Sequence, residues 1–139
     1  MKGGIIYKEI KKISGKQLFE LYKSVGWIKE DCIDDNGELV DMHKNAVNVF
    51  SAWDNKKLVG VVRVLTDKTE NGVLFGLVVR KEYQNKGIGT KLIKRCMKEY
   101  PKIEWFISTM NPKAKNLYTK LGFKKTKEEW FSKKEKWRK

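Results

Sequence analysis

The sequence predicts a mixed α/β domain, and three observations support that class. Two alternating segments, residues 47–53 and 58–65, flank the turn "DNKK" as the strands of a hairpin do. Residues 73–79 form an almost continuous apolar run, which is typical of a central strand buried on both faces. Helical spacing follows over residues 87–100, so strands and helices alternate along the chain. The predicted order is β-α-(α)-β-β-β-α-β-α-β-β.

The N-terminal part of the chain predicts a strand and two helices. Residues 5–10 alternate weakly and indicate the first strand. Ser14 is suited to cap a following helix, which Gly26 ends. The apolar face of that helix consists of Leu18, Leu21, Tyr22 and Val25. After a polar stretch that contains "DDNG", residues 39–46 predict a short second helix.

The helix predicted over residues 87–100 has one apolar face and ends before Pro101. That face consists of Ile88, Leu92, Ile93, Cys96 and Met97. Residues 103–108 alternate again and predict a further strand, with Ile103, Trp105 and Ile107 on one face and Phe106 on the other.

The C-terminal part predicts a last helix and two closing strands. The helix begins at Asn111 and Pro112, because proline suits the first helical position. Gly122 occupies the place of a left-handed cap at its end. Residues 123–126 and 129–133 are the predicted closing strands, and a charged tail follows them.

Length and composition predict a single domain over residues 1–139, with enough apolar residues for a core. No apolar run approaches the ~20 residues that a membrane span needs, and the N-terminus lacks a signal-peptide pattern. We therefore expect a cytoplasmic protein without a membrane partner. The two cysteines form no CxxC and the chain has one histidine, so we expect neither a disulfide framework nor a metal site. Cys96 is expected to be buried and inert.

The net charge of +14 suits an anionic partner, but the composition does not favour specific recognition of nucleic acid. Only four of the 31 basic residues are arginines, and the planar guanidinium suits base and phosphate readout better than lysine does. The lysines are spread along the chain. We therefore interpret the charge as a solvated, lysine-rich surface, with nucleic-acid binding as a remote alternative.

The loop between residues 73–79 and the next helix has the composition of an anion site. Gly87 and Gly89 let the backbone approach a ligand, and the first N–H groups of a helix lack internal partners. Lys86 and Lys91 add positive charge. The glycine spacing alone is equally compatible with a tight strand-to-helix turn. A Walker loop and a Rossmann fingerprint fit less well, because a lysine before Thr90 and a third glycine are missing.

Two motifs of the chain together resemble those of a known family. "QNKGIG", residues 84–89, has the pattern Gln/Arg-x-x-Gly-x-Gly/Ala, and "NPKAKNLYTKLGF", residues 111–123, has the pattern Asn-x-x-Ala-x-x-x-Tyr-x-x-x-Gly-Phe. In this order they resemble the acetyl-CoA signature and the following helix of the GNAT superfamily of N-acetyltransferases. The resemblance implies the GNAT acyltransferase fold, a central, mostly antiparallel sheet of six to seven strands flanked by about four helices.

The resemblance also implies a binding site for acetyl-CoA. Backbone amides of the signature loop would bind the pyrophosphate, and the residues concerned are Gln84, Asn85, Lys86, Gly87, Ile88, Gly89 and Thr90. The central strand would splay from its neighbour and offer main-chain groups to the pantetheine arm and the acetyl carbonyl, through Leu77, Val78 and Val79. Core packing of those three side chains is compatible with this role, because only their backbone is used.

Tyr118 matches the family's tyrosine that protonates the departing thiolate and is the predicted catalytic residue. A phenol of pKa ~10 is protonated at neutral pH and can serve a thiolate of pKa ~8.5. Asn111 and Ala114 match positions that contact the cofactor and share a helix face with Tyr118. A helix cap is an alternative role for Asn111, and ring packing is an alternative for Tyr118.

The acceptor side is less determined by the sequence. Histone-acetylating members carry a glutamate where this chain has Val73, which disfavours a protein lysine as acceptor and leaves the general base unassigned. Glu30, Asp31 and His43 lie in the segment that lines the acceptor pocket of similar enzymes, although a lone histidine is more often a surface or capping residue. Trp27 is equally compatible with a pocket wall and a core position.

We therefore expect an N-acetyltransferase that moves an acetyl group from acetyl-CoA to a primary amine of a small molecule, by direct attack in a ternary complex. Neither cysteine is placed to be a nucleophile. Acetylation of a protein N-terminus or lysine is the alternative, and a non-catalytic acyl-CoA-binding protein is a remote one, against which Tyr118 argues. A homodimer is implied by the resemblance alone.

Overall fold

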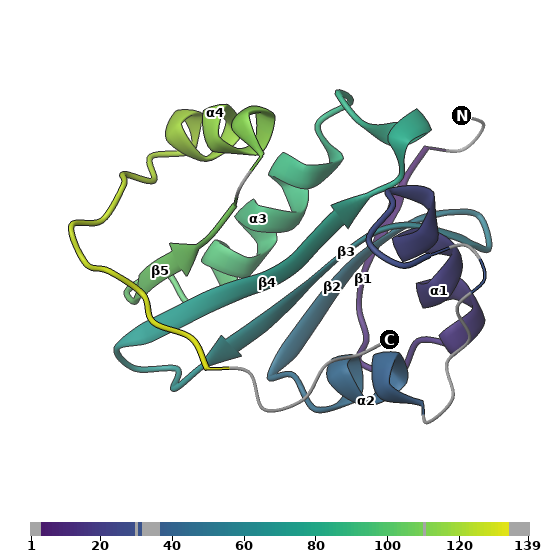
Figure 1. The fold of residues 1–139 in the computed structure, drawn as a ribbon, viewed down its shortest axis with the longest axis horizontal. Helices are drawn as coiled ribbons and strands as arrows, with labels where there is room; N and C mark the ends of the chain where they lie inside the picture. The colour runs from purple at the N-terminus through teal and green to yellow at the C-terminus, as the bar shows by residue number, and fades with distance from the viewer. Residues whose placement is uncertain (1–3, 30, 32–36, 110, 134–139) are drawn as a thin grey trace. The chain divides into compact units, whose positions relative to one another are not determined.

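A five-stranded sheet organises the first of two compact units of the chain, which lies within residues 1–108 (Figure 1). The computed structural model describes residues 4–29, 31, 37–109 and 111–133. The strands follow one another across the sheet in chain order. They are β1 (Ile6–Glu9), β2 (Asn48–Asp54), β3 (Lys57–Thr66), β4 (Asn71–Val79) and β5 (Glu104–Ile107). Neighbours are antiparallel except β4 and β5, which are parallel because α3 connects them.

Two helices cover one face of this sheet and a third covers the other (Figure 1). Helices α1 (Gly15–Ser24) and α2 (Glu38–Lys44) lie on the first face, and α3 (Ile88–Glu99) lies on the second. Helix α1 begins where predicted, because the Ser14 hydroxyl accepts a hydrogen bond of 3.2 Å from the Gln17 N–H. Predicted and observed helix ends differ by one or two residues, as fraying termini do.

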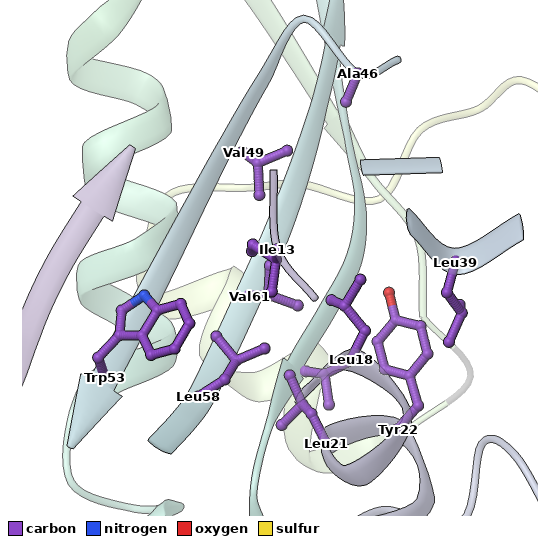
Figure 2. Packing of buried hydrophobic residues seen from close by; sticks show 11 residues of the cluster. Ile13, Leu18, Leu21, Tyr22, Leu39, Ala46, Val49, Trp53, Leu58 and Val61 are labelled. Atoms are coloured by element: carbon purple, nitrogen blue, oxygen red, sulfur yellow. The ribbon is translucent and has the colours of Figure 1, made fainter. Parts of the chain in front are cut away.

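The core on the first face joins α1 and α2 to β2, β3 and β4 (Figure 2). Leu18 and Leu21 of α1 and Val61 of β3 have no exposed surface. The cluster consists of Ile13, Leu18, Leu21, Tyr22, Leu39, Ala46, Val49, Trp53, Leu58, Val61 and Val78. Truncating one such leucine to alanine costs about 2–5 kcal/mol, so this core holds the first face of the sheet in place.

On the second face, α3 approaches β3 closely at Gly60. A Cβ at Gly60 would lie 3.2 Å from Cδ1 of Leu92 and 3.3 Å from Cγ2 of Ile88, so glycine is what lets the helix reach the strand. Cys96, also on the buried face of α3, is fully buried as predicted. Burial raises the pKa of its thiol to about 12, which leaves it protonated and unreactive.

Strand β4 is only partly paired on the side of β5. The parallel register runs from Asn71 opposite Glu104 to Leu74 opposite Ile107 and stops there. On its other side β4 stays paired with β3 up to Val79, with a bulge near Gly76, whose φ is +63°. The second half of β4 therefore keeps one strand neighbour and has an open edge toward β5.

The open edge explains why residues 73–79 are less buried than their apolar run predicts. Leu74 and Val78 are buried, but Leu77 and Val79 are half-buried and Phe75 is exposed. A strand covered on both faces was the expectation, and it is wrong for Phe75. The run is apolar without full burial because the neighbouring strand ends before it.

The second unit, within residues 109–139, is built on helix α4 (Pro112–Lys120). Gly122 follows the helix with φ +95°, the left-handed cap that the sequence predicts. The predicted closing strands at residues 123–126 and 129–133 are wrong, because these residues form neither strand. Neither segment alternates: Phe123 is followed by two lysines, and Trp130 and Phe131 are adjacent and exposed. The described sheet accordingly has five strands, where six to seven were predicted.

Within the part of the chain that the structure describes, no helix combines the length and the apolar character that crossing a bilayer requires.

Candidate active site

The signature loop begins where β4 leaves the sheet. Arg80 N–H donates to the carbonyl of Val59 at 2.9 Å, and the Arg80 guanidinium donates to the carbonyl of Leu58 at 2.9 Å. A 3₁₀ helix, η1 (Lys81–Tyr83), then turns the chain. After this 3₁₀ helix, the side-chain amide of Gln84 donates a 2.8 Å hydrogen bond to the carbonyl of Val79. The first residue of the signature therefore holds the loop against the strand.

A second tie joins the loop to the turn between β2 and β3. The Tyr83 hydroxyl donates a 2.5 Å hydrogen bond to the carboxylate of Asp54, and this bond raises the pKa of Tyr83. Lys57 of the same turn lies 3.6 Å from the exposed carboxylate of Glu82. The exposed ion pair contributes little, so the buried ring of Tyr83 and its hydrogen bond are the main restraint.

The turn from the loop into α3 is made by two residues in the left-handed region. Asn85 has φ +62° and Gly87 has φ +85°. A Cβ added at Gly87 would meet no atom within 4 Å, so steric space is open there and the glycine is needed for its φ. Of the two glycines of the signature, Gly87 therefore has the left-handed conformation that favours glycine.

The backbone N–H groups of Asn85 through Thr90 donate no hydrogen bond to an acceptor within residues 4–29, 31, 37–109 and 111–133. The first amide of this region with a partner is Lys91, which donates to the carbonyl of Gly87 at 3.0 Å. Three of the free groups, at Ile88, Gly89 and Thr90, belong to the first turn of α3, where the helix dipole is positive. Such a run of unpaired amides at a helix N-terminus suits a phosphate group.

Gln84 differs from the other signature residues. Its N–H donates to the carbonyl of Lys81 at 3.2 Å, so that amide is not available to a ligand. Lys86 adds an ammonium group beside the loop, with its Nζ 5.7 Å from the centre of the Tyr83 ring. The donor set suited to a ligand therefore starts at Asn85.

Of the predicted residues Leu77, Val78 and Val79, Val79 directs its main-chain groups to the open edge of β4, whereas Val78 pairs with Val61 of β3. In an antiparallel ladder, successive residues direct their N–H and C=O groups to alternate sides. Because Arg80 N–H bonds to β3, the N–H and C=O of Val79 point to the open edge, where the Gln84 side chain takes the carbonyl. The Val79 N–H is left as a donor on that edge, a few residues before the signature loop.

The structure brings Asn111, Ala114 and Tyr118 together on α4, in the second unit. Asn111 caps the helix, because its side chain accepts a 2.9 Å hydrogen bond from the Lys113 N–H. Ala114 is half-buried and Tyr118 is 9% exposed, with its ring centre 6.1 Å from that of Phe123. Burial raises the pKa of the Tyr118 phenol, so it is protonated at neutral pH and can donate a proton.

The residues expected on the acceptor side have different environments. His43 has no exposed surface, so it does not line a pocket. Trp27 is 57% exposed and lies against Tyr22, with 5.7 Å between ring centres, so the pocket-wall interpretation fits its exposure better than a core position. Asp31 is exposed, and Glu30 lies outside the described residues.

His43 is a structural residue. Its Nδ1 donates to the carbonyl of Leu39 at 2.8 Å, which leaves Nε2 as the acceptor for the Tyr22 hydroxyl at 3.3 Å. Burial lowers its pKa, and the nearby Arg63 lowers it further. The neutral imidazole therefore orients Tyr22.

Arg63 was not singled out by the sequence analysis. It lies on β3 directly opposite Phe75, with its guanidinium 5.9 Å from the centre of that ring. Its Nε is buried without a hydrogen-bond partner. A signal was present in "VVRVL", where one charged residue interrupts an apolar strand.

The comparisons with known proteins establish the family. The model of the Acetyltransferase (GNAT) domain matches residues 45–125, which include β2 through α4. The chain belongs to the GNAT acetyltransferases, as the resemblance of its two motifs predicted.

Three relatives illustrate the similarity. The spermidine N(1)-acetyltransferase of Vibrio cholerae serotype O1 is 30% identical over 110 residues, which cover 70% of this chain and 63% of that protein. A GNAT-family acetyltransferase from Streptococcus pneumoniae TIGR4 has a TM-score of 0.73 at 21% identity, covering 94% of this chain and 100% of that chain. AAC(6')-Iy in complex with the bisubstrate analogue CoA-S-monomethyl-acetylneamine has a TM-score of 0.71 at 17% identity. The match covers 95% of this chain and 99% of that chain. The two structures show a common fold.

The curated relatives are longer than the matched region. The chain spans 59% to 66% of the length of the four that it matches.

Proposed function

We propose that this protein is an N-acetyltransferase that uses acetyl-CoA to acetylate a primary amine of a small molecule. The observation that carries the proposal is the run of unpaired amides from Asn85 to Thr90 beside the open edge of β4. Together they offer a site for a diphosphate and, next to it, a donor for a carbonyl oxygen. A thioester of coenzyme A carries both of these groups, a diphosphate and a carbonyl oxygen, and its enzyme must bind both.

In this proposal the chain's residues do three things. The amides of residues 85–90 bind the diphosphate, and the Val79 N–H polarises the acetyl carbonyl. The acceptor nitrogen attacks the carbonyl carbon, the carbon–sulfur bond breaks, and Tyr118 donates a proton to the departing thiolate. The nitrogen loses one proton, so the products are the N-acetyl amine and free coenzyme A.

The names of two relatives support a small amine as acceptor. One is a spermidine acetyltransferase, and the other was solved with an analogue that joins coenzyme A to an acetylneamine. The valine at position 73 agrees with this choice, because the glutamate of histone-acetylating members is absent there. Transfer to a protein N-terminus or lysine is the alternative that the test must address. A single catalytic domain, a cytoplasmic location and a homodimer remain part of the proposal.

The test has two readouts. Isothermal titration with coenzyme A measures binding without turnover, and release of free thiol from acetyl-CoA measures transfer to a panel of amines and peptides. We expect coenzyme A to bind, and at least one small amine to accelerate thiol release above the hydrolysis rate. Acceleration by peptides alone would favour the protein acceptor. If coenzyme A binds and no amine or peptide accelerates thiol release, the transferase proposal is wrong and the protein only binds acyl-CoA.

A further inference from the structure

A positive charge that has no counter-charge among the described residues lies on the face of the sheet that α1 and α2 cover. Arg63 is half-buried in the middle of β3, between the buried residues Val62 and Val64. Its Nε has no hydrogen-bond partner, and no carboxylate of residues 4–29, 31, 37–109 and 111–133 forms an ion pair with it. A guanidinium that is partly desolvated and unpaired is unfavourable by itself, and an anion at its Nη groups would offset that cost.

Arg63 packs closely against a glycine of the neighbouring strand. Gly76 of β4 has φ +63°, and a Cβ there would lie 3.3 Å from Arg63 Nε and 3.4 Å from the Tyr22 hydroxyl oxygen. Glycine at this bulge therefore keeps the space beside both groups free of a side chain. The Tyr22 hydroxyl is held by the buried His43, and Phe75 lies beneath the guanidinium. The result is a cationic and aromatic corner to which no carboxylate of the described residues is paired.

This corner adjoins the part of β4 that is proposed to meet the thioester. Gly76 lies three residues before Val79, whose N–H points to the open edge. A ligand group bound at Arg63 would consequently lie within the reach of a small molecule from the acetyl carbonyl.

We propose that Arg63 binds an anionic group of the acceptor, so that the substrates are small primary amines that also carry a carboxylate or a phosphate-type group. The inference rests on the proposed function and specifies its substrate class. The guanidinium pairs with such a group in a bidentate manner and repels polyamines, so the preferred acceptor differs from the spermidine of the Vibrio cholerae relative. The reaction is unchanged: the amine gains the acetyl group, and coenzyme A leaves as the thiol.

The test compares four primary amines of similar length and different charge. They are γ-aminobutyrate with a carboxylate, aminopropylphosphonate with a phosphonate, neutral butylamine and the diamine putrescine. We expect kcat/KM for at least one anionic amine to exceed that for butylamine by about 10- to 100-fold, the effect of one charge-assisted hydrogen-bonded pair, and putrescine to be the poorest. The first two amines distinguish a carboxylate from a phosphate-type group.

Variants of Arg63 separate recognition from folding. Arg63→Gln should remove the advantage of the anionic amine over butylamine, and an unchanged Kd for coenzyme A would show that the variant is folded. Arg63→Lys should retain part of the advantage, and Arg63→Glu should transfer it to putrescine. Arg95→Gln is the matched control, because Arg95 also lies over an aromatic ring, 5.8 Å from the centre of Phe50, but on α3.

The outcomes are distinct. A preference for the anionic amine that Arg63→Gln abolishes and Arg95→Gln preserves supports the inference. A wild-type preference for butylamine or putrescine, or an anionic preference that survives in Arg63→Gln, overturns it and leaves the proposed transferase intact. Should no amine release thiol although coenzyme A binds, the proposed function itself is wrong.

Discussion

The side-chain amide of Gln84 donates a 2.8 Å hydrogen bond to the carbonyl of Val79. This contact joins the first residue of the signature loop to the last residue of β4. It means that the side chain of the signature's glutamine supports the loop, while its own N–H is already bonded to Lys81. The amides proposed to bind diphosphate therefore belong to the residues that follow it.

Replacing Gln84 should accordingly loosen the loop without removing a ligand contact. Gln84→Ala is expected to lower the free energy of unfolding by about 1 kcal/mol and to weaken coenzyme A binding severalfold. Gln17→Ala is the matched control, because the Gln17 amide also donates to a main-chain carbonyl, that of Lys56 at 2.7 Å. Denaturation and calorimetric titration give both quantities. Equal losses of coenzyme A affinity in the two variants would contradict the supporting role.

Gly87→Val should damage coenzyme A binding more than Gln84→Ala does. The left-handed φ of +85° strains any side chain by about 1–2 kcal/mol, and the branched side chain would occupy the open space beside the free amides. We expect the affinity for coenzyme A to fall by about tenfold or more. Calorimetric titration of the folded variant is the measurement.

Gly26→Val controls for backbone strain alone. Gly26 has φ +78°, and no atom lies within 4 Å of the position its Cβ would take. It should lose a similar amount of stability and keep its affinity for coenzyme A. If Gly87→Val folds and binds coenzyme A as the wild type does, the loop does not cradle the diphosphate.

Tyr118→Phe should lower kcat by about 100-fold with little change in the KM for acetyl-CoA, because the ring stays and only the proton donor is lost. Burial raises the pKa of Tyr118 above its usual value of 10.0, so the phenol stays protonated as pH rises. Ionisation of Tyr118 should therefore cause no loss of wild-type kcat at a pH below 10.0. Tyr100→Phe, which loses a 2.6 Å hydrogen bond to Asn48, is the control. Unchanged kcat in Tyr118→Phe would reject the role as acid.

His43 makes the stability of the protein depend on pH. Burial lowers its folded-state pKa below the usual 6.5, so below that pH the unfolded chain binds a proton that the folded chain does not. The free energy of unfolding should therefore fall as pH drops from about 7.5 to about 5.5. It is the sole histidine of the chain, so His43→Gln should flatten this dependence. Parallel slopes for the two proteins in thermal denaturation would disprove the assignment.

The sequence predicted those elements whose patterns are local. The hairpin of β2 and β3 follows from alternation around one turn, and α3 follows from its spaced apolar residues and two glycines. The predicted closing strands at residues 123–126 and 129–133 are wrong, and neither segment has the alternation of a strand. Single aromatics carry no period, so the pattern could not distinguish a strand from irregular chain there.

The candidate site was predictable where it depends on the signature and not where it depends on tertiary pairing. The amides of residues 85–90 were foreseen from glycine and helix-start chemistry. The premature end of the register at Leu74 sets the open edge, and it depends on the length of β5, a distant segment. The corner around Arg63 depends in turn on a bulge that brings Gly76 close beside the guanidinium. A local sequence pattern predicts neither the end of the β4–β5 register nor the bulge at Gly76.

The left-handed pair Asn85 and Gly87 has a consequence for how the loop can change. The backbone conformation determines where the main-chain donors of this loop lie. The side chains at its remaining positions therefore have little effect on those donors. Substitutions at Lys86 or Thr90 would alter charge and solubility while the donors stay in place. What this loop must retain is the handedness of two residues and the ties through Gln84 and Tyr83, a far smaller demand than a pocket lined by side chains makes.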